Sequence, residues 1–516
     1  MVAAAPWALV ELGDALRAAG LPVPAEATTG GGGPGSRPMP MPMPMPVAPT
    51  PTHSALDWAE SGLMALTGQP GRPPVVPAAP VLDRARAAAE LLTAVSTWLG
   101  SPVFADVAEI LGGRAALLGL RRGGTVSANG SCRLMRAADG WVAVNLARPD
   151  DVDAVPALLG AEITDDVWDA LAAALPRWRS RDLVERAWLL GLPVAPLPSA
   201  AAAAGAGAGG AGDGGAGGAD AGGLDPGSGF AVVRVSGGAT GRRPSSDGPP
   251  GSPGPTSAPA PLVVDLSSLW AGPLAARLLG QLGLRVIKVE SVHRPDGARR
   301  GDPDFYRWLH MGQDETRFDF HEPAGRAALQ DLVEQADVVI EGSRPRALAQ
   351  LGLDAQAWVA ARPGRVWLSI TGYGRRVAAQ ADGAGPVAFG DDAAVGGGLV
   401  AWDQTAPGGP VPVFCGDAIA DPLAGLFGAL AVVLCRAAGR GALVDVAMRD
   451  VAAFVAGPRS GVRGGGVGGG GSRARGAHEQ GEPPWEVTGS DELGWTVHQA
   501  GRQAPVRPPR PPQLRG

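Results

Sequence analysis

Apolar residues in the second half of the chain follow two alternating patterns. Short apolar runs, typical of buried strands, lie at residues 262–266, 284–289, 337–341, 365–370 and 443–446. Between them, apolar residues recur every three or four positions, which predicts helices at 271–282, 324–335, 347–361 and 422–436. Strands and helices in alternation predict an α/β domain with a doubly wound, Rossmann-like parallel sheet. Its site should lie at the carboxyl ends of the strands.

The first half predicts a different, smaller α+β domain. Helical periodicity occurs at 55–66, 82–99, 167–175 and 181–190, and one strand at 141–146 follows the turn Asp139-Gly140. The first twenty residues predict a short amphipathic helix. They contain no Lys or Arg before Arg17 and include Glu11 and Asp14, so they lack the charge order of a secretory signal.

Glycine and proline divide the chain into parts. The 79 Gly and 50 Pro gather in blocks with too little apolar surface to offset the entropy of ordering a backbone, which predicts disordered linkers rich in Gly, Pro and Ala. The expected organisation is a helical segment at 1–28, a Pro/Met/Gly linker at 29–52, a partial domain at 53–199, a linker at 200–260, the nucleotide-fold domain at 261–458 and a mostly disordered tail at 459–516.

Charge and cysteine content narrow the function classes. A net charge of −6 without a basic stripe argues against a nucleic-acid partner. The three cysteines have no metal-ligand spacing, so neither a disulfide framework nor a metal site is expected, and a reducing cytoplasm fits best. The longest apolar run, 422–435, is shorter than the roughly 20 residues that cross a bilayer. It predicts a buried helix and no membrane association.

The turn after the first predicted strand is a candidate anion site. It reads Asp265-Leu-Ser-Ser-Leu-Trp-Ala-Gly-Pro273, and Gly272-Pro273 would open a helix whose free N–H groups suit a phosphate. The Gly-x-Gly-x-x-Gly spacing of dinucleotide sites does not occur in this turn, which disfavours a nicotinamide enzyme. A plain tight turn between strand and helix explains the same spacing.

Asp421 is the candidate catalytic group. It stands in Cys415-Gly-Asp-Ala-Ile-Ala-Asp421-Pro-Leu-Ala-Gly425, directly before the predicted apolar helix. One interpretation is an N-cap, with Pro422 at the first helical position. The other is a nucleophile, because the small neighbours Gly416 and Gly425 leave room for a bulky thioester. The two roles are compatible.

These segments, taken in order, resemble the class III coenzyme A transferases, the CaiB/BaiF-like family that includes formyl- and carnitine-coenzyme A transferases. No single match is specific, but their order over nearly 200 residues is. The matching segments of the second half are 264–273, 283–290, 336–345, 369–374, 421–425 and 443–448. The first half resembles a later part of the same family at 57–68, 139–144 and 190–196, so the chain resembles two partial copies fused.

The resemblance implies transfer of coenzyme A between an acyl-coenzyme A donor and a carboxylic acid acceptor through a covalent intermediate on Asp421. Coenzyme A would be bound as the thioester of the substrate, and the reaction would need no metal. The protein is expected to be a cytoplasmic homodimer. Asp83 falls near the nucleophile's place in the first copy but lacks the motif's glycine. The residues implied to hold coenzyme A are Leu269, Trp270, Ala271, Gly272, Pro273, Arg344, Gly372 and Tyr373, with N–H groups near Gly372 and Gly374 as oxyanion donors.

Two other functions stay open. An acyl-coenzyme A racemase needs an acid and a base on opposite faces of a carbon, yet no His occurs between His321 and His478. A catalytically degenerate paralogue that binds acyl-coenzyme A is the other alternative. It is favoured by departures from the family pattern, namely Ser291, Gly342-Ser343 and the stretch 310–314.

Overall fold

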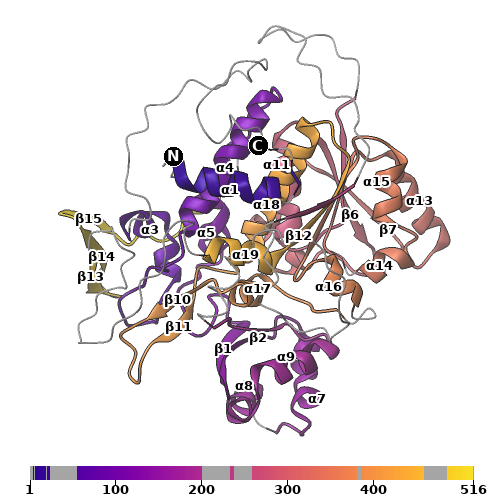
Figure 1. The fold of residues 1–516 in the computed structure, drawn as a ribbon. Helices are drawn as coiled ribbons and strands as arrows, with labels where there is room; N and C mark the ends of the chain where they lie inside the picture. Colours follow the sequence, from indigo (N-terminus) through magenta and orange to yellow (C-terminus); the bar gives the residue numbers. More distant parts are fainter. Residues whose placement is uncertain are drawn as a thin grey trace, which may run out of the picture.

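The computed structural model describes residues 4, 6–18, 20–21, 23, 55–164, 166–199, 233–237, 259–343, 345–380, 385–457 and 485–514. A doubly wound domain, a layer of helices from the first half and a small α+β domain make up most of this part of the chain (Figure 1).

Seven strands form the central sheet in the order β4-β12-β9-β8-β5-β6-β7. All neighbours pair in parallel except β4, which runs antiparallel to β12 at one edge. The chain moves outward in opposite directions from β5 and β8, and such a reversal is where doubly wound sheets bind ligands. The predicted sheet is confirmed. Its strands are β4 (Arg234–Ser236), β5 (Leu262–Asp265), β6 (Arg285–Ser291), β7 (Asp314–Phe318), β8 (Val338–Glu341), β9 (Val366–Thr371) and β12 (Ala442–Ala447).

Successive strand residues face opposite sides of the sheet, and each side is covered by helices. Val263 joins the core beneath one helical layer, whereas Val264 joins the core beneath the other, which explains why the inner strands of the sheet are mainly apolar. The first layer holds α11 (Ala271–Gln281), α12 (Pro303–His310), α18 (Ala420–Ala437) and α19 (Met448–Ala456). The second holds α13 (Pro323–Gln335), α14 (Pro345–Gln350) and α15 (Ala355–Ala361).

The helix expected at 347–361 is two helices, α14 and α15. Gly352 lies between them with a φ of 74°, a left-handed conformation that ends a helix. Shorter elements complete the domain, and the sequence patterns did not predict them. They are η3 (Gly297–Arg300), α16 (Arg375–Gln380), α17 (Gly390–Gly396) and the antiparallel pair β10 (Val400–Asp403) and β11 (Val411–Phe414).

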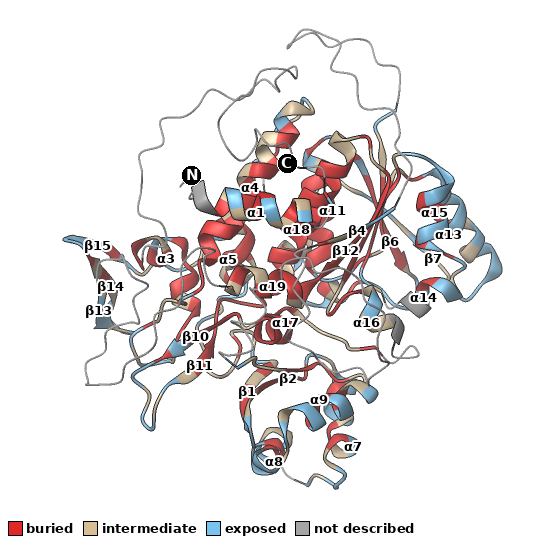
Figure 2. Cartoon of the chain, viewed as in Figure 1, coloured by how far each residue is buried: buried red, intermediate tan, exposed pale blue. Residues whose placement is uncertain are grey.

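Helix α18 is the centre of the hydrophobic core. It lies between the sheet and helix α4 (Val81–Trp98), and Figure 2 shows both helices buried along most of their length. Its 18 residues are apolar enough to cross a membrane by composition, but 83% of that window is buried inside the protein. A helix covered on all sides has no polar face, so the apolar run in the sequence reflects core packing.

The first half covers the second within one chain. Leu91, Leu92 and Val95 of α4 share a hydrophobic core with Leu426 and Leu430 of α18. Each half therefore buries apolar surface that the other would leave exposed. The first-half helices outside the small domain are α1 (Pro6–Ala18), α3 (Ala55–Ser61), η1 (Leu63–Leu66), α4 and α5 (Val107–Leu117).

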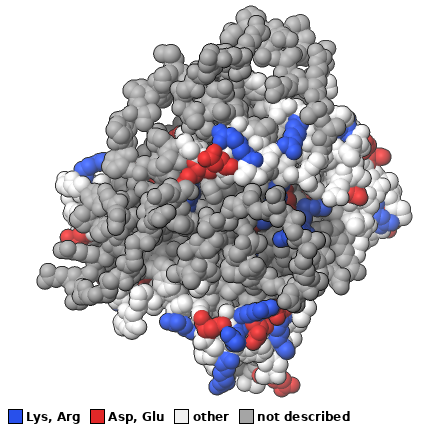
Figure 3. Space-filling view, viewed as in Figure 1, with Lys and Arg blue, Asp and Glu red and all other residues white. Residues whose placement is uncertain are grey.

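The small domain has its own core around an antiparallel sheet in the order β1-β2-β3. The sequence pattern did not predict strand β1, because two arginines interrupt its apolar residues. Arg133 lies over the ring of Trp168, and Arg136 lies over the ring of Trp141. On the face shown in Figure 3, its basic and acidic side chains are interspersed. Its elements are β1 (Cys132–Ala137), β2 (Gly140–Asn145), α6 (Pro149–Asp153), α7 (Val155–Leu159), α8 (Val167–Ala174), η2 (Leu175–Arg177), α9 (Ser180–Leu189) and β3 (Val194–Pro196).

Two segments expected to be disordered contain strands. Within the linker at 200–260, β4 takes its hydrogen bonds from β12, a partner about 200 positions away that local patterns do not reveal. The expectation of a mostly disordered tail from 459 is wrong for residues 485–514. There β13 (Trp485–Ser490), β14 (Gly494–Gln499) and β15 (Arg502–Pro505) form a three-stranded sheet, and Val497 and Ala504 enter the main core.

The close contact between α11 and α18 predicts the effect of one methyl group. A Cβ at Gly425 would lie 2.5 Å from the carbonyl oxygen of Ala271, so we expect Gly425→Ala to lower the free energy of unfolding by about 1 to 3 kcal/mol. The control is Gly280→Ala in α11, where the nearest atom is 3.5 Å away. Urea unfolding followed by circular dichroism compares the two, and equal stability would contradict this packing.

Candidate active site

The turn that leads into α18 presents Asp421. Between β11 and the helix, Gly416 has a φ of 76° and Ala418 a φ of 42°. A left-handed conformation is unusual for a residue other than glycine, so neighbouring contacts must hold Ala418 in place. The turn reverses the chain in a short distance and places Asp421 in the first turn of α18, partly exposed to solvent.

Asp421 does not cap its own helix. Helix α18 begins at Ala420, after Ile419, so Asp421 is the second helical residue and the N-cap interpretation is wrong. Its carboxylate Oδ2 instead accepts a hydrogen bond from the backbone N–H of Gly390, at 3.1 Å, where α17 begins. The side chain is thereby directed at a neighbouring element and not at its own backbone.

Two first-half residues hold the start of the turn. Nη1 of Arg114, in α5, donates to both carboxylate oxygens of Asp417 at 2.8 and 2.9 Å. The Asp417 side chain is fully buried, and the Arg114 side chain is 21% exposed. The hydroxyl of Thr67 accepts a 3.3 Å hydrogen bond from the backbone N–H of Gly416. The residues just before Asp421 are thus held from the other half of the chain.

Asp391 and Asn129 hold the centre of the turn. Asp391 Oδ1 accepts from the backbone N–H of Ala418 at 2.9 Å, which helps to fix the left-handed residue. Its other oxygen accepts from Asn129 Nδ2 at 2.7 Å, and the same nitrogen lies 3.4 Å from Asp417 Oδ1. Asn129 precedes β1, so the small domain also contributes to this network.

The carboxylates shift one another's protonation. Burial raises the pKa of Asp421 to about 7, the charge of Arg114 opposes this, and the nearby charges of Asp391 and Asp417 add to it. Burial and the charge of Asp417 raise the pKa of Asp391 to about 6. A carboxyl with a pKa near 7 is a mixture of acid and carboxylate at neutral pH, so Asp421 can take up or lose a proton there.

Asp392 is a further buried carboxyl beside this group. Its Oδ1 accepts from Asn145 Nδ2 and from the Phe389 backbone N–H, both at 2.9 Å. Burial raises its pKa to about 7. It therefore titrates in the same range as Asp421.

The turn between β5 and α11 brings five expected binding residues together at the switch point. Leu269 has a φ of 73° and is 38% exposed, and its backbone N–H donates to Asp296 at 2.9 Å. Asp296 lies 3.0 Å from the buried ammonium group of Lys288, which also donates to the backbone carbonyl of Ser267. The guanidinium of Arg114 lies 5.5 Å from the ring centroid of Trp270. Arg114 thus lies between this turn and the turn that holds Asp421.

The other expected binding residues do not lie in this turn, and those that the structure describes are packed against neighbouring residues. Tyr373 is buried, with its ring edge-on to Trp188 at 5.0 Å, so its side chain presents little surface to a ligand. Gly372 packs closely against Ala388, and the N–H of Gly374 already donates to Thr371 Oγ1 at 2.8 Å. Arg344 lies outside the described residues.

Asp83, the weaker catalytic candidate, is buried in the first turn of α4 and is not among the described partners of Asp421. Sequence reasoning missed Arg114, Asn129 and Asp391. The available signal was indirect, since an aspartate such as Asp417 beside a long apolar run needs a partner if it is buried.

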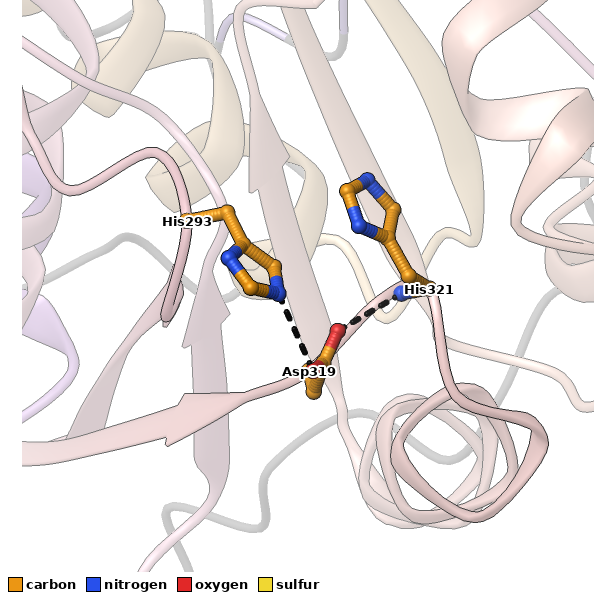
Figure 4. A group of neighbouring side chains, drawn as sticks. All are labelled: His293, Asp319 and His321. Carbon is orange, nitrogen blue, oxygen red and sulfur yellow. Dashed lines mark hydrogen bonds and ion pairs between the residues drawn. The ribbon is translucent and has the colours of Figure 1, made fainter.

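His293, Asp319 and His321 meet at the carboxyl ends of β6 and β7 (Figure 4). Their possible ligand atoms lie within 4.8 Å of one another, a donor set that suits zinc. However, Asp319 already accepts from His293 Nε2 at 3.0 Å and from the His321 N–H at 2.9 Å. Metal-binding imidazoles usually donate their second nitrogen to another group, and the described residues provide no such partner here. We assign this trio as a contact between two loops.

The raised pKa values predict how stability depends on pH. Asp392 has a pKa near 7 in the fold and near 3.9 when unfolded, so the folded state keeps a proton that the unfolded state releases between those values. That stabilisation is complete below about pH 4 and is lost as the pH rises through 7. We expect Asp392→Asn to flatten the fall in unfolding free energy between pH 4 and 8, measured by urea titration.

The opposite change serves as the control. Asn145→Ala removes a hydrogen bond that favours the ionised form of Asp392, so the fall should become steeper. If both variants keep the wild-type slope, Asp392 does not titrate in this range.

Comparison with known proteins found a matching family model and similar curated proteins. Residues 262–488 match the model of CoA-transferase family III. Over 212 residues the chain is 30% identical to succinate–glutarate CoA-transferase of Agrobacterium fabrum, covering 37% of this chain and 51% of that protein. Over 236 residues it is 31% identical to the alpha subunit of succinyl-CoA–L-malate CoA-transferase of Chloroflexus aurantiacus, covering 42% and 53%.

Among solved structures, a CAIB/BAIF family protein from Brucella suis is similar at 28% identity with a TM-score of 0.33, over 37% of this chain and 53% of that one. The chain spans about half the length of the curated relatives it matches. Residues 262–488 of this chain are therefore similar to CoA-transferase family III.

Proposed function

We propose that this protein transfers coenzyme A between an acyl-coenzyme A donor and a carboxylic acid acceptor, with Asp421 as the nucleophile. One observation carries the proposal. Asp421 is a partly exposed residue at the start of a buried helix, its carboxyl group has a pKa raised by burial, and Arg114 links its turn to the Leu269–Pro273 turn at the sheet's switch point. Named CoA-transferase relatives support the reaction class.

In the first half of the reaction, a carboxylate oxygen of Asp421 attacks the thioester carbonyl carbon. The carbon–sulfur bond breaks, coenzyme A leaves as a thiolate, and an acyl-aspartyl anhydride remains. The thiolate then attacks the aspartyl carbonyl. The donor acid leaves as a carboxylate, and Asp421 becomes an aspartyl thioester of coenzyme A.

The second half reverses these steps with the acceptor acid. The acceptor carboxylate attacks the aspartyl thioester and expels the thiolate, which attacks the acceptor carbonyl of the new anhydride and releases Asp421 as a carboxylate. Every bond that breaks is replaced, so no oxidant or reductant is consumed. The N–H of Gly390, already aimed at Asp421 Oδ2, is placed to stabilise negative charge on the aspartyl oxygen.

The other site residues have supporting roles in this proposal. The turn from Leu269 to Pro273 would hold the nucleotide end through the exposed Leu269, as Gly372 and Arg344 would, whereas Trp270 to Pro273 and Tyr373, which are buried, would act through their packing. A cytoplasmic homodimer without a metal or a membrane partner, built from two partial family copies, is part of the same proposal.

The racemase alternative gains nothing from the site, because the described contacts of Asp421 include no histidine. A degenerate paralogue that binds acyl-coenzyme A without turning it over is the main rival, and the experiments below separate it from a transferase.

We expect Asp421→Asn to abolish transfer while the fold remains, because the carboxamide has the same shape but is not a nucleophile. Intact mass spectrometry after incubation with a panel of acyl-coenzyme A esters should show a covalent adduct on the wild type and none on the variant. Asp83→Asn is the matched control and should keep both adduct and turnover. Binding without adduct or turnover in the wild type would favour the degenerate paralogue, and full activity in Asp421→Asn would refute the nucleophile.

We also expect Arg114→Gln to reduce kcat by about 10- to 100-fold, because positioning within a site is worth several kcal/mol. The change removes the charge that lowers the pKa of Asp421, so the pH at which activity is half maximal should rise above about 7.

The control is Arg72→Gln. Arg72 makes an ion pair of similar length between the halves, 2.9 Å to Asp403, but is not among the charges that shift Asp421. If both variants lose stability equally and neither moves the pH profile, Arg114 has only a structural role.

A further inference from the structure

The segment after β15, residues 506–514, lies extended along the first-half helices α3 and α5. Its burial repeats every third residue: Val506 and Pro509 are half-buried and Pro512 is buried, whereas the residues between them are exposed. A period of three is that of the polyproline II helix, which has three residues per turn and no internal hydrogen bonds. The sequence of this segment, with prolines at 508, 509, 511 and 512, favours that conformation.

Glycines form the floor beneath this segment. A Cβ at Gly112 would lie 3.1 Å from Pro509 Cβ, and at Gly113 the three nearest atoms, from 3.3 Å, all belong to Pro512. Gly62, with a φ of 87°, lies directly under the backbone of Pro509. Two adjacent glycines inside an 11-residue helix are unfavourable for α5 itself, since only proline is a poorer helix former. The close approach of the proline-rich segment explains why glycines occupy these two positions of α5.

Polar contacts fix the position of the segment along the groove. The backbone N–H of Arg507 donates to the carbonyl of Ala59 in α3 at 3.0 Å. Arg510 lies 3.6 Å from the carboxylate of Asp106, the N-cap of α5, and the backbone of Gln513 hydrogen-bonds the Glu109 carboxylate. Contacts therefore recur from one end of the groove to the other.

We propose that α3 and α5 form a recognition groove for a polyproline II ligand, and that residues 506–514 of this same chain are its ligand. The groove recognises two features of the ligand: prolines spaced three residues apart, and a backbone that packs closely against the glycines of the groove. The interaction is separable, so the same sequence supplied as a peptide can replace the attached segment. Since Arg114 follows Gly113 in α5, the docked segment also braces the residue that holds Asp417; only this last link rests on the proposed transferase function.

A peptide-binding experiment on the full chain tests the groove. A fluorescein-labelled peptide of residues 503–516 is titrated by anisotropy into three proteins: the wild type, P509G/P512G, and P509G/P512G with Gly113→Leu. A control peptide carries Gly at 509 and 512 but keeps all its arginines.

We expect saturable binding to P509G/P512G, whose attached segment no longer competes, and at least tenfold weaker binding to the other two proteins. The control peptide should bind at least tenfold more weakly to P509G/P512G. Failure of the peptide to bind P509G/P512G overturns the proposal. Equal binding to all three proteins, or equal binding of the control peptide, also overturns it, because charge alone would then explain the contact.

A second measurement holds even if P509G/P512G loses structure. In the wild type, Gly113→Leu should lower the Tm by a few degrees, since the new side chain meets Pro512. In a Pro512→Gly background the same change should leave the Tm equal or higher, because Leu favours a helix more than Gly does. The same shift in both backgrounds shows that the segment does not occupy the groove.

Discussion

The burial of α18 is the constraint on which the site depends. Because the sheet, α11 and α4 surround this helix, its position and its first residue are fixed by core packing. The chain leaving β11 must therefore reverse within six residues, which requires left-handed backbone at Gly416 and Ala418. A left-handed alanine costs about 1 to 2 kcal/mol and persists only where its surroundings hold it. The hydrogen bond from Ala418 to Asp391 supplies that restraint.

The same packing gathers aspartates in a region that disfavours charge. Asp391, Asp417 and Asp421 meet where Arg114 is the described cation that offsets all three. Burial raises the pKa of each, and the ion pair with Arg114 opposes this at Asp417. Such a group lowers stability at neutral pH, a cost common at functional sites, where reactivity needs groups that a purely structural core would exclude. The electrostatics thus point to the same place as the backbone strain.

Elements that depend on the local pattern of residues were predictable from the sequence. Elements that depend on partners far away in the chain were not. The strands at 262–265 and 366–371 were readable because both faces of a parallel sheet are buried. Its small neighbours and the helix after it mark Asp421 as a candidate in the sequence, but they do not predict its orientation, since that depends on Gly390. Arg114 lies 303 positions from Asp417, and no local pattern joins them. Strand β4 and residues 485–505 were missed for the same reason, because tertiary pairing decides them.

The order of the parts along the chain does not set their order in space. Helix α4 and the small domain precede the sheet in sequence, yet α4 covers α18 and Asn129 reaches the turn before Asp421. Two partial family copies in one chain would explain this, since each would supply what the other lacks. The Arg114–Asp417 pair forms within a single chain. The described surroundings of Asp421 therefore come from both halves of a single chain.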